Sequence, residues 1–434
     1  PTPGHPWSVE TAHQDVADRN ILTGRVRYYG DDIAAVVAED EITAQRALRL
    51  IEVEYEEYPV EIHPRKSMYG SKPPIHLDKK DNVLVRSNYF IGNVEEGLKE
   101  SETVIKRSYK TPIVQHCHIE NPISCAYMEN GRIIVVTSTQ IPHIVRRVIG
   151  QALGIPWGKI RVIKPYIGGG FGNKQDVLYE PLNAFLTTQV GGRPVKLDIT
   201  REETFCNTRT RHSIEYDLTA GVDSEGHLLA KDMLAISNQG AYASHGHAIA
   251  ANGLTAWRLQ YACPNIKGEA YTVYTNTPVG GAMRGYGIPQ VCFAIECFMD
   301  DIAKEIGMDP LEFRKKNLIK GYYEDAYLKP IAANTNGIFE CLEKGDICGI
   351  IGFSGAGKSG HDYQFIPWDL HINIFQIVRS CTAYNNFIQH ELLFLLQLFD
   401  FIPQICGVFE FQQFCGFFHL GSQLFDQCTL FFAA

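Results

Sequence analysis

The sequence predicts an α+β fold in which strands and helices are mixed along roughly the first 345 residues. Near the N-terminus, a short apolar run at 32–37, a helical stretch at 42–50 and an alternating segment at 51–55 predict the order strand, helix, strand. Further on, 132–138 has the composition of a buried strand, and 142–153 that of a helix with proline in its first turn. The order of these elements indicates a small unit followed by a larger mixed one.

The expected domain boundaries follow from these elements and from the segments between them. We expect a small N-terminal unit over 1–65, a linker rich in proline, lysine and serine over 66–86, and a larger unit over 87–345. The larger unit is predicted to continue with strands at 160–166 and 228–237 and helices at 177–190, 290–307 and 310–318. Asp309, which precedes a proline, is the expected N-cap of the last helix.

Composition excludes several classes of protein. The chain has 434 residues, of which 45% are hydrophobic and 21% charged, and its net charge is −9. Nucleic acids and anionic membranes select basic surfaces, so neither is expected as the main partner. The 12 cysteines form no C-x-x-C pair, which favours reduced thiols in a cytoplasmic protein. The chain begins at Pro1 without a leader pattern, so we expect an incomplete N-terminus.

The composition changes sharply after about residue 345. From 360 to 434 the only basic residue is Arg379, and more than half of the 23 phenylalanines fall there. A membrane span needs about 18 to 20 apolar residues in a row, and charged residues or proline interrupt every candidate. A buried extra domain would carry more charge on its outer face. We therefore expect this phenylalanine-rich tail to be a non-native frame or a junction, with its fold unassigned.

Two glycine-rich stretches are candidates for ligand binding. Gly168–Gly172 is expected between a strand and a helix, where backbone N–H groups can approach an anionic ligand. It is not the dinucleotide fingerprint, because Asn173 stands where the last glycine is required. In Gly280–Gly287, Arg284 lies among small residues and suits a phosphate or an oxo-anion. A tight connection and a structural salt bridge are the alternative interpretations.

Three other motifs are weaker candidates. His116-Cys117-His118 with Glu120 would place two histidines on one face of a strand, but no further metal ligand follows at standard spacing. His245 and His247 are better explained by a polar loop. Gly352–Ser359 matches the P-loop pattern G-x-x-x-x-G-K-[ST], and residues 346–359 form an isolated P-loop-like segment. No apolar helix follows it, so a working nucleotide site is not favoured.

Three motifs in order carry a family resemblance. Thr137-Ser138-Thr139-Gln140, Gly168 through Gln175, and Ala282-Met283-Arg284-Gly285-Tyr286-Gly287 resemble the molybdenum hydroxylase family of xanthine dehydrogenases and aldehyde oxidases. The likeness spans nearly all of residues 1–345 and is strongest to the separate large subunit of bacterial xanthine dehydrogenases. It implies an α/β hammerhead-like domain followed by the first part of a mixed α/β molybdopterin-binding domain.

The resemblance implies a molybdenum–molybdopterin cofactor that hydroxylates a carbon next to nitrogen or oxygen, with water as the oxygen source. Gln140 would contact the oxo ligand of the metal. Phe171 and Gly172 would present backbone amides to the cofactor, and Arg284 would lie on its other side. These residues are therefore the expected contacts of the molybdenum centre. Tyr286 falls where the family places an aromatic ring that stacks on the substrate.

Two positions depart from the pattern of the animal xanthine-oxidising enzymes. Gln175 stands where a substrate-binding glutamate is usual, and Asn252 where an arginine is usual. Both replacements are neutral amides, which donate and accept hydrogen bonds but supply no charge. A substrate bound here is expected to be recognised by its hydrogen-bond pattern. Xanthine, hypoxanthine, another N-heterocycle and an aldehyde therefore remain open.

The resemblance ends near Gly345. In the family, the glutamate that acts as general base comes nearer the C-terminus, so no catalytic base is assigned in this chain. We expect the chain alone to be a truncated, inactive part of a purine- or heterocycle-oxidising enzyme. Partner subunits carrying [2Fe–2S] clusters and FAD are implied in a hetero-oligomer. The alternatives are an ATP-binding protein that uses Gly352–Ser359 and a non-catalytic scaffold.

Overall fold

The computed structural model describes residues 3–8, 16–70, 73–319, 322–324, 330–332 and 337–342. All of these belong to one of the two compact units into which the chain divides. The P-loop-like segment 346–359 and the tail 360–434 lie outside the described residues. In the part of the chain that is described, no helix is long and apolar enough to cross a membrane.

The larger sheet has the strand order β1-β11-β10-β9-β2. Its strands are β1 (Val83–Ile91), β2 (Thr103–Lys110), β9 (Ile214–Val222), β10 (Leu228–Gly240) and β11 (Asn265–Tyr274). β10 and β11 are parallel, with Met233 opposite Gly268, and the other three pairings are antiparallel. Side chains of β9 alternate between buried and half-buried positions, as expected for a strand with one face on a core.

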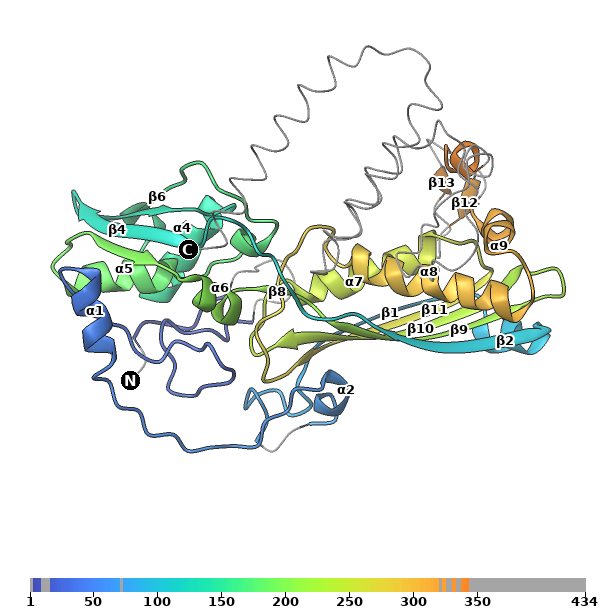
Figure 1. Cartoon of the computed structure of the whole chain (residues 1–434), viewed down its shortest axis with the longest axis horizontal. Coiled ribbons are helices and arrows are strands. Elements are labelled where there is room, and N and C mark those ends of the chain that lie inside the picture. Colours follow the sequence, from blue (N-terminus) through green and yellow to red (C-terminus); the bar gives the residue numbers. More distant parts are fainter. Residues whose placement is uncertain are drawn as a thin grey trace, which may run out of the picture. The chain divides into compact units, whose positions relative to one another are not determined.

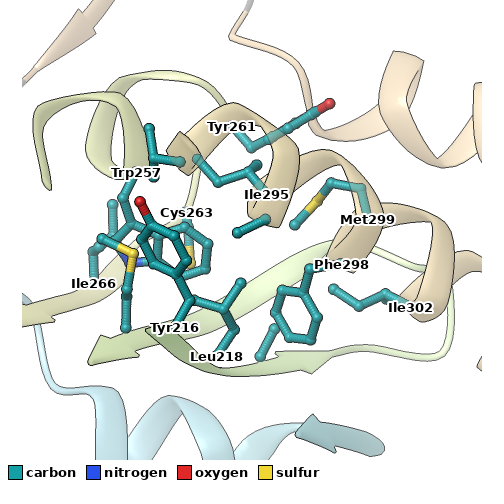
Figure 2. Close-up of a cluster of buried hydrophobic side chains, with 14 of the residues drawn as sticks. Tyr216, Leu218, Trp257, Tyr261, Cys263, Ile266, Ile295, Phe298, Met299 and Ile302 are labelled. Carbon is teal, nitrogen blue, oxygen red and sulfur yellow. The ribbon is translucent and has the colours of Figure 1, made fainter. Parts of the chain in front are cut away.

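Helices cover one face of this sheet (Figure 1). They are α7 (Gly246–Leu259) and α8 (Ile288–Glu305), followed by α9 (Pro310–Asn317), which packs on α8. Figure 2 shows the core between helices and sheet, where Trp257, Ile295 and Phe298 meet Tyr216 and Leu218 of β9. These side chains are almost completely removed from water, so this cluster is the main apolar core of the described residues.

The opposite face of the larger sheet carries shorter helices. α2 (Pro64–Ser67) and α3 (Val94–Glu100) contact β10 and β11. A second small cluster lies there, formed by Val83, Ile236 and Val273 with Met68 packed against it. Because successive residues of a strand point to opposite faces, Ala235 belongs to the main core and its neighbour Ile236 to this cluster.

The second sheet has the order β6-β5-β4-β7. Its strands are β4 (Ile123–Glu129), β5 (Arg132–Thr137), β6 (Ile160–Ile163) and β7 (Val195–Asp198), and α4 (Pro142–Leu153) and α5 (Glu180–Gln189) pack against it. Asn130 and Gly131 join β4 to β5 with φ angles of 51° and 72°. Both angles are positive, as in the two-residue hairpin turns that favour Asn-Gly.

The remaining elements are short. They are β3 (Val114–Gln115), η1 (Trp157–Lys159), η2 (Asn173–Gln175), α6 (Arg201–Asn207), β8 (Thr210–Arg211), β12 (Tyr322–Glu324) and β13 (Pro330–Ala332). The predicted strand at 132–138 and the predicted helices at 142–153, 290–307 and 310–318 are confirmed to within two residues at each end. Asp309 is confirmed as an N-cap, since its side chain accepts from the backbone N–H groups of Leu311 and Glu312.

The expected strands of the N-terminal unit are wrong. The helix α1 (Glu41–Leu48) is present, but 32–37 and 51–55 form no strand. Leu50, Tyr55 and Val60 are all exposed, and none of the described strands pairs with this segment. An alternating pattern forms a strand only where another strand pairs with its backbone N–H and C=O groups. The pattern itself does not show whether such a partner strand is present.

Other boundaries also differ from expectation. β1 begins at Val83, inside the predicted linker, and pairs with β11. The helix expected at 177–190 begins only at Glu180. His116 and His118 do not share the face of a strand, because β3 ends at Gln115 and Cys117 has a φ of 53°. A residue with a positive φ is not in the extended conformation of a strand. The alternation of side chains between two faces, on which that expectation depended, is therefore interrupted at Cys117.

Candidate cofactor and substrate site

The first glycine-rich loop follows β6 and has an unusual backbone. Gly169 and Gly172 have φ angles of 94° and 109°, and the non-glycine Phe171 between them has a φ of 52°. The loop leads into the 3-10 helix η2 and not directly into an α-helix. The expected contribution of an α-helix N-terminus to anion binding is therefore absent from this part of the described chain. Phe171 has about half of its side chain exposed.

Gln140 lies against this loop. Its backbone N–H donates to the carbonyl oxygen of Lys174 at 2.8 Å. Its side-chain oxygen accepts from the backbone N–H of Gly172 at 3.2 Å. A Cβ atom at Gly170 would approach that same oxygen to 2.6 Å, so a larger residue here would have to displace the Gln140 side chain. The loop is thus wrapped closely around an exposed glutamine.

The second glycine-rich loop packs directly on the first. The backbone N–H of Arg284 donates to the carbonyl oxygen of Phe171 at 2.9 Å. A Cβ atom at Gly172 would lie 2.5 Å from the carbonyl oxygen of Ala282. Arg211 also holds the second loop, since its guanidinium donates to the carbonyl oxygen of Arg284 at 2.9 Å. The four predicted cofactor contacts therefore come together, with Phe171 and Gly172 on the first loop, Arg284 on the second, and Gln140 against the first.

The three predicted substrate residues adjoin the same loops. The side-chain amide of Asn252 donates to the carbonyl oxygen of Tyr286 at 3.1 Å. The imidazole Nε2 of His245 lies 3.2 Å from the carbonyl oxygen of Gln175. The His245 and Tyr286 rings form an edge-to-face pair with their centroids 5.7 Å apart. His245 thus links Gln175 to Tyr286, and Asn252 joins them through its bond to Tyr286.

An ion pair supports the first loop from behind. Lys174, whose side chain is buried, pairs with Glu120, and the Glu120 carboxylate also accepts from the backbone N–H of Gly168 at 3.0 Å. Burial acts to raise the pKa of Glu120, but these two hydrogen bonds outweigh it and leave that pKa below its ordinary value. Burial lowers the pKa of Lys174, although Glu120 opposes the shift. The pair holds the loop between residues 168 and 174.

A second ion pair is completely buried. The guanidinium of Arg209 and the carboxylate of Asp176 both have no exposed side-chain surface. The same carboxylate accepts from the hydroxyl of Ser244 at 2.7 Å and from the backbone N–H of Val177 at 2.8 Å. Buried charges persist where partners satisfy them in this way, because an unpaired buried charge is costly. Asp176 follows Gln175 directly, so this pair fixes one end of the predicted substrate side.

The histidines of the first weak candidate are structural. His116 lies 2.7 Å from the carbonyl oxygen of Ala282, and burial lowers its pKa to about 4. His118 lies 2.6 Å from the carbonyl oxygen of Glu120 and 2.9 Å from the amide of Asn173, and burial lowers its pKa as well. The described residues contain no group of three or more His, Cys, Asp or Glu that could hold a metal ion. The metal interpretation of these histidines therefore has no support.

The two loops fit a group that brings its own metal ligands. Gln140, Phe171 and Arg284 are all exposed, Phe171 and Arg284 on the two loops and Gln140 next to the first. They offer an amide, an aromatic ring and a guanidinium, but no thiolate or carboxylate that would ligate the metal directly. Within the described residues, the backbone N–H of Phe171 donates no hydrogen bond to the protein. These are the properties needed to hold a large oxygen-rich cofactor by hydrogen bonds.

Several supporting residues were missed by the sequence interpretation. They are Glu120, Lys174, Asp176, Arg209, Arg211 and His245. Lys174 lies within the glycine-loop motif and Asp176 directly after it, but their partners Glu120 and Arg209 lie 54 and 33 residues away in sequence. No local pattern identifies such partners. The one available signal was charged residues next to glycines, where buried charge requires a partner.

The fold and the paired loops define a domain that binds molybdopterin, and comparison with known proteins supports this. Residues 75–318 match the family model of the molybdopterin cofactor-binding domain. Residues 1–59 match the a/b hammerhead domain of aldehyde oxidase and xanthine dehydrogenase. The chain belongs to the molybdenum hydroxylase family of xanthine dehydrogenases and aldehyde oxidases.

Individual relatives agree with this assignment. The chain is 46% identical over 348 residues to a putative xanthine dehydrogenase molybdenum-binding subunit of Escherichia coli, a match covering 79% of this chain and 46% of that protein. It is 33% identical to the nicotinate dehydrogenase large molybdopterin subunit of Eubacterium barkeri, covering 75% of this chain and 76% of that one. The chain thus spans less than half the length of the Escherichia coli relative.

A solved structure shows the same fold. The aldehyde oxidoreductase from Desulfovibrio gigas matches with a TM-score of 0.73 and 26% sequence identity, over 80% of this chain and 39% of that one. The expected mixed α/β molybdopterin-binding architecture is therefore confirmed.

Proposed function

We propose that this chain supplies the cofactor-binding part of an enzyme that hydroxylates a purine or a related N-heterocycle. When bound, the molybdenum cofactor supplies the oxidation of a ring carbon, with water as the oxygen source. The observation that carries the proposal is the contact between the two loops, in which Arg284 donates to Phe171 next to Gln140. Gln140, Phe171, Gly172 and Arg284 hold the cofactor.

On the substrate side, Tyr286 packs on the face of the heteroaromatic ring. Gln175 and Asn252 read its polar edge with neutral amides, which match a pattern of hydrogen-bond donors and acceptors. The nicotinate and xanthine dehydrogenases among the relatives act, by their names, on N-heterocycles. This agreement favours a heterocycle over an aldehyde for the present chain.

We propose that the 434-residue chain alone does not catalyse the reaction. The family resemblance assigns the general base to a region that the matching part, which ends before residue 345, does not include. Transfer of electrons is assigned to partner subunits that carry [2Fe–2S] clusters and FAD. The cytoplasmic location stays a prediction, supported by the free thiols of the seven described cysteines.

The test has two parts. First, the 434-residue chain is purified, its molybdenum content is measured, and dye reduction is assayed with hypoxanthine, xanthine, nicotinate and an aldehyde. We expect substoichiometric metal and no turnover, and stoichiometric metal with turnover would contradict the inactivity. Second, the same substrates are given to the complete enzyme assembled with its partner subunits. Oxidation of a heterocycle supports the proposal, whereas activity on the aldehyde alone would exclude it.

A variant tests the substrate side in the complete enzyme. Gln175→Glu restores a charged carboxylate at the position where animal xanthine-oxidising enzymes have glutamate. We expect kcat/KM for the heterocycles to change by about tenfold or more, the factor that corresponds to about 1.4 kcal/mol of transition-state stabilisation. Unchanged relative rates would remove Gln175 from the substrate site.

A further inference from the structure

One buried loop lies between the N-terminal region and the predicted substrate side. This substrate-side loop, residues 241–245, connects β10 to α7. Tyr242, Ser244 and His245 are buried to 6% exposure or less. Because these side chains are buried, the position of the loop depends on the residues that it contacts on each side.

The N-terminal region holds the first half of the loop. The hydroxyl of Tyr242 donates to the carboxylate of Asp31 at 2.9 Å and accepts from the guanidinium of Arg27 at 3.2 Å. The backbone N–H of Ala243 donates to the carboxylate of Asp18 at 2.7 Å. The guanidinium of Arg19 lies 5.4 Å from the centroid of the Tyr242 ring. Four charged residues from the first 31 positions thus converge on two loop residues.

The second half of the loop contacts the substrate side. Ser244 donates to the carboxylate of Asp176 at 2.7 Å, next to Gln175. His245 lies 3.2 Å from the carbonyl oxygen of Gln175 and packs edge-to-face on Tyr286. Two of the three proposed substrate residues are therefore contacted directly by this loop.

The cofactor side is held by different residues. Gln140 bonds to Gly172 and to Lys174, and the Arg284 loop is supported by His116 and Arg211. None of these described contacts involves the first 32 residues of the chain. These contacts do not include the loop 241–245 either, although the two sides meet where the backbone N–H of Gln175 donates to the carbonyl oxygen of Gly172 at 3.0 Å.

We propose that Tyr242 is a positioning residue through which the N-terminal region sets the geometry of the substrate side. The Tyr242 hydroxyl, held by Asp31 and Arg27, fixes the loop so that Ser244 and His245 orient Asp176, Gln175 and Tyr286. This inference rests on the proposed function for its consequence in catalysis. The loop contacts themselves do not depend on it.

The chain offers a closely matched pair of variants. Tyr242→Phe removes one hydroxyl and leaves Arg27 bonded to the carbonyl oxygen of Arg25 and Asp31 bonded to the backbone N–H of Arg27. Tyr261→Phe removes a hydroxyl that donates to the carboxylate of Glu296 at 2.9 Å. Both tyrosines are 3% exposed, so the two changes remove equivalent hydrogen bonds, one at the loop and one elsewhere.

Hydrogen–deuterium exchange on the full chain gives the first measurement. We expect Tyr242→Phe to speed exchange of the Ala243 amide by roughly threefold to tenfold, the range that one net hydrogen bond represents. Tyr261→Phe should leave it unchanged. Equal loop exchange in the two variants would overturn the inference, whatever the substrate of the enzyme is.

Kinetics of the complete enzyme give the second measurement. Tyr242→Phe and Ser244→Ala are expected to raise KM for the heterocycle by roughly threefold to tenfold, with molybdenum content unchanged. Tyr261→Phe should leave KM as in the wild type. A KM rise of the same size in Tyr261→Phe, or loss of molybdenum in Tyr242→Phe, would also overturn the inference. If the wild type oxidises no heterocycle, the proposed function fails, and the exchange measurement still decides whether Tyr242 positions the loop.

Discussion

Lys231 is a lysine of β10 whose ammonium group is buried at the end of a helix. It donates to the carbonyl oxygens of Trp257 and Tyr261, both at 2.7 Å, and lies 5.1 Å from the Trp257 ring centroid. The last carbonyls of a helix lack partners within the helix, and a positive charge there is favourable. Burial nevertheless lowers the pKa of Lys231 to about 8. The residue therefore links the charge state of one side chain to the stability of α7.

Replacing Lys231 by methionine should change how stability depends on pH. The folded pKa of about 8 lies below the ordinary lysine value of 10.5, so between these values the unfolded chain binds more protons. In the wild type, Lys231 therefore makes the free energy of unfolding rise with pH across this window. Urea titrations at intervals from pH 7.5 to 9.5 should show a smaller rise in Lys231→Met.

A surface lysine provides the control for that experiment. Lys99 is exposed on α3, and Lys99→Met removes a lysine without disturbing a buried group. We expect its pH dependence to follow the wild type. Identical slopes for Lys231→Met and the wild type would show that burial does not shift the titration of Lys231.

At the scale of elements, the two glycine-rich loops act as one unit. They are connected by the hydrogen bond from Arg284 to Phe171, and the backbone at Gly172 fits closely under Ala282. Gly172 serves two purposes, because it adopts a φ of 109° and leaves room for the neighbouring carbonyl. Only glycine satisfies both conditions at low cost.

Alanine at Gly172 should therefore be more damaging than alanine at a glycine that meets the first condition alone. Gly191 has a φ of 69° and nothing within 4 Å of an added Cβ. Gly191→Ala should cost roughly 1–2 kcal/mol of unfolding free energy through backbone strain. Gly172→Ala should cost about 1–3 kcal/mol more through the contact with Ala282. Equal losses in urea denaturation would mean that the loops separate without penalty.

At the scale of the whole described unit, buried titratable groups join segments that are far apart in the chain. Asp18 binds Ala243 and Tyr274, which lie more than 200 positions away. His76 lies 2.7 Å from the carbonyl oxygen of Ala241. Burial keeps the Asp18 carboxyl group and the His76 imidazole neutral over a wider pH range than in water. The free energy of unfolding of the unit therefore depends on pH.

Between pH 6.5 and 4, buried histidines and buried carboxyl groups change the free energy of unfolding in opposite directions. Burial lowers the pKa of His76, His116 and His212 to about 4, so the stability they contribute above pH 6.5 is lost as pH falls toward 4. Burial raises the pKa of Asp18 and Asp32 to about 6, and these two contribute stability that grows as pH falls from 6 to 3.8. Burial also raises the pKa of Asp31, Asp176, Glu180 and Asp232, so the histidines and the carboxyl groups act in opposite directions as pH falls from 6.5 to 4.

A single variant separates the two contributions. Protonation of Asp18 stabilises the fold as pH falls, and Asp18→Asn removes this contribution. As pH falls from 6 to 4, the free energy of unfolding of the variant should therefore decrease relative to that of the wild type. The measurement is urea denaturation across that range. If the free energy of unfolding of Asp18→Asn does not decrease relative to that of the wild type over this range, the pKa of Asp18 is not raised in the folded state.

Local signals in the sequence were sufficient for several elements. α4 was predicted with its observed ends, because Pro142 occupies its first turn and Gly154 follows it in the left-handed conformation. α9 was identified in the same way from Asp309 and Pro310. The strands expected at 32–37 and 51–55 failed, because a strand depends on a partner that lies elsewhere in the chain.

The same distinction applies to the site. Gln140, Phe171, Gly172 and Arg284 were recognisable because each lies in a short motif, and glycines needed for close approach are visible in the sequence itself. Their contact across the two loops was not visible, nor was the pairing of Asp176 with Arg209 or the connection of Tyr242 to Asp31. Motifs record what the backbone needs within a few residues, whereas a buried charge or hydroxyl is satisfied by whichever distant segment packs against it. The family and its cofactor could therefore be predicted from the order of residues alone, and the support of the substrate side by the N-terminal region became visible only in the folded chain.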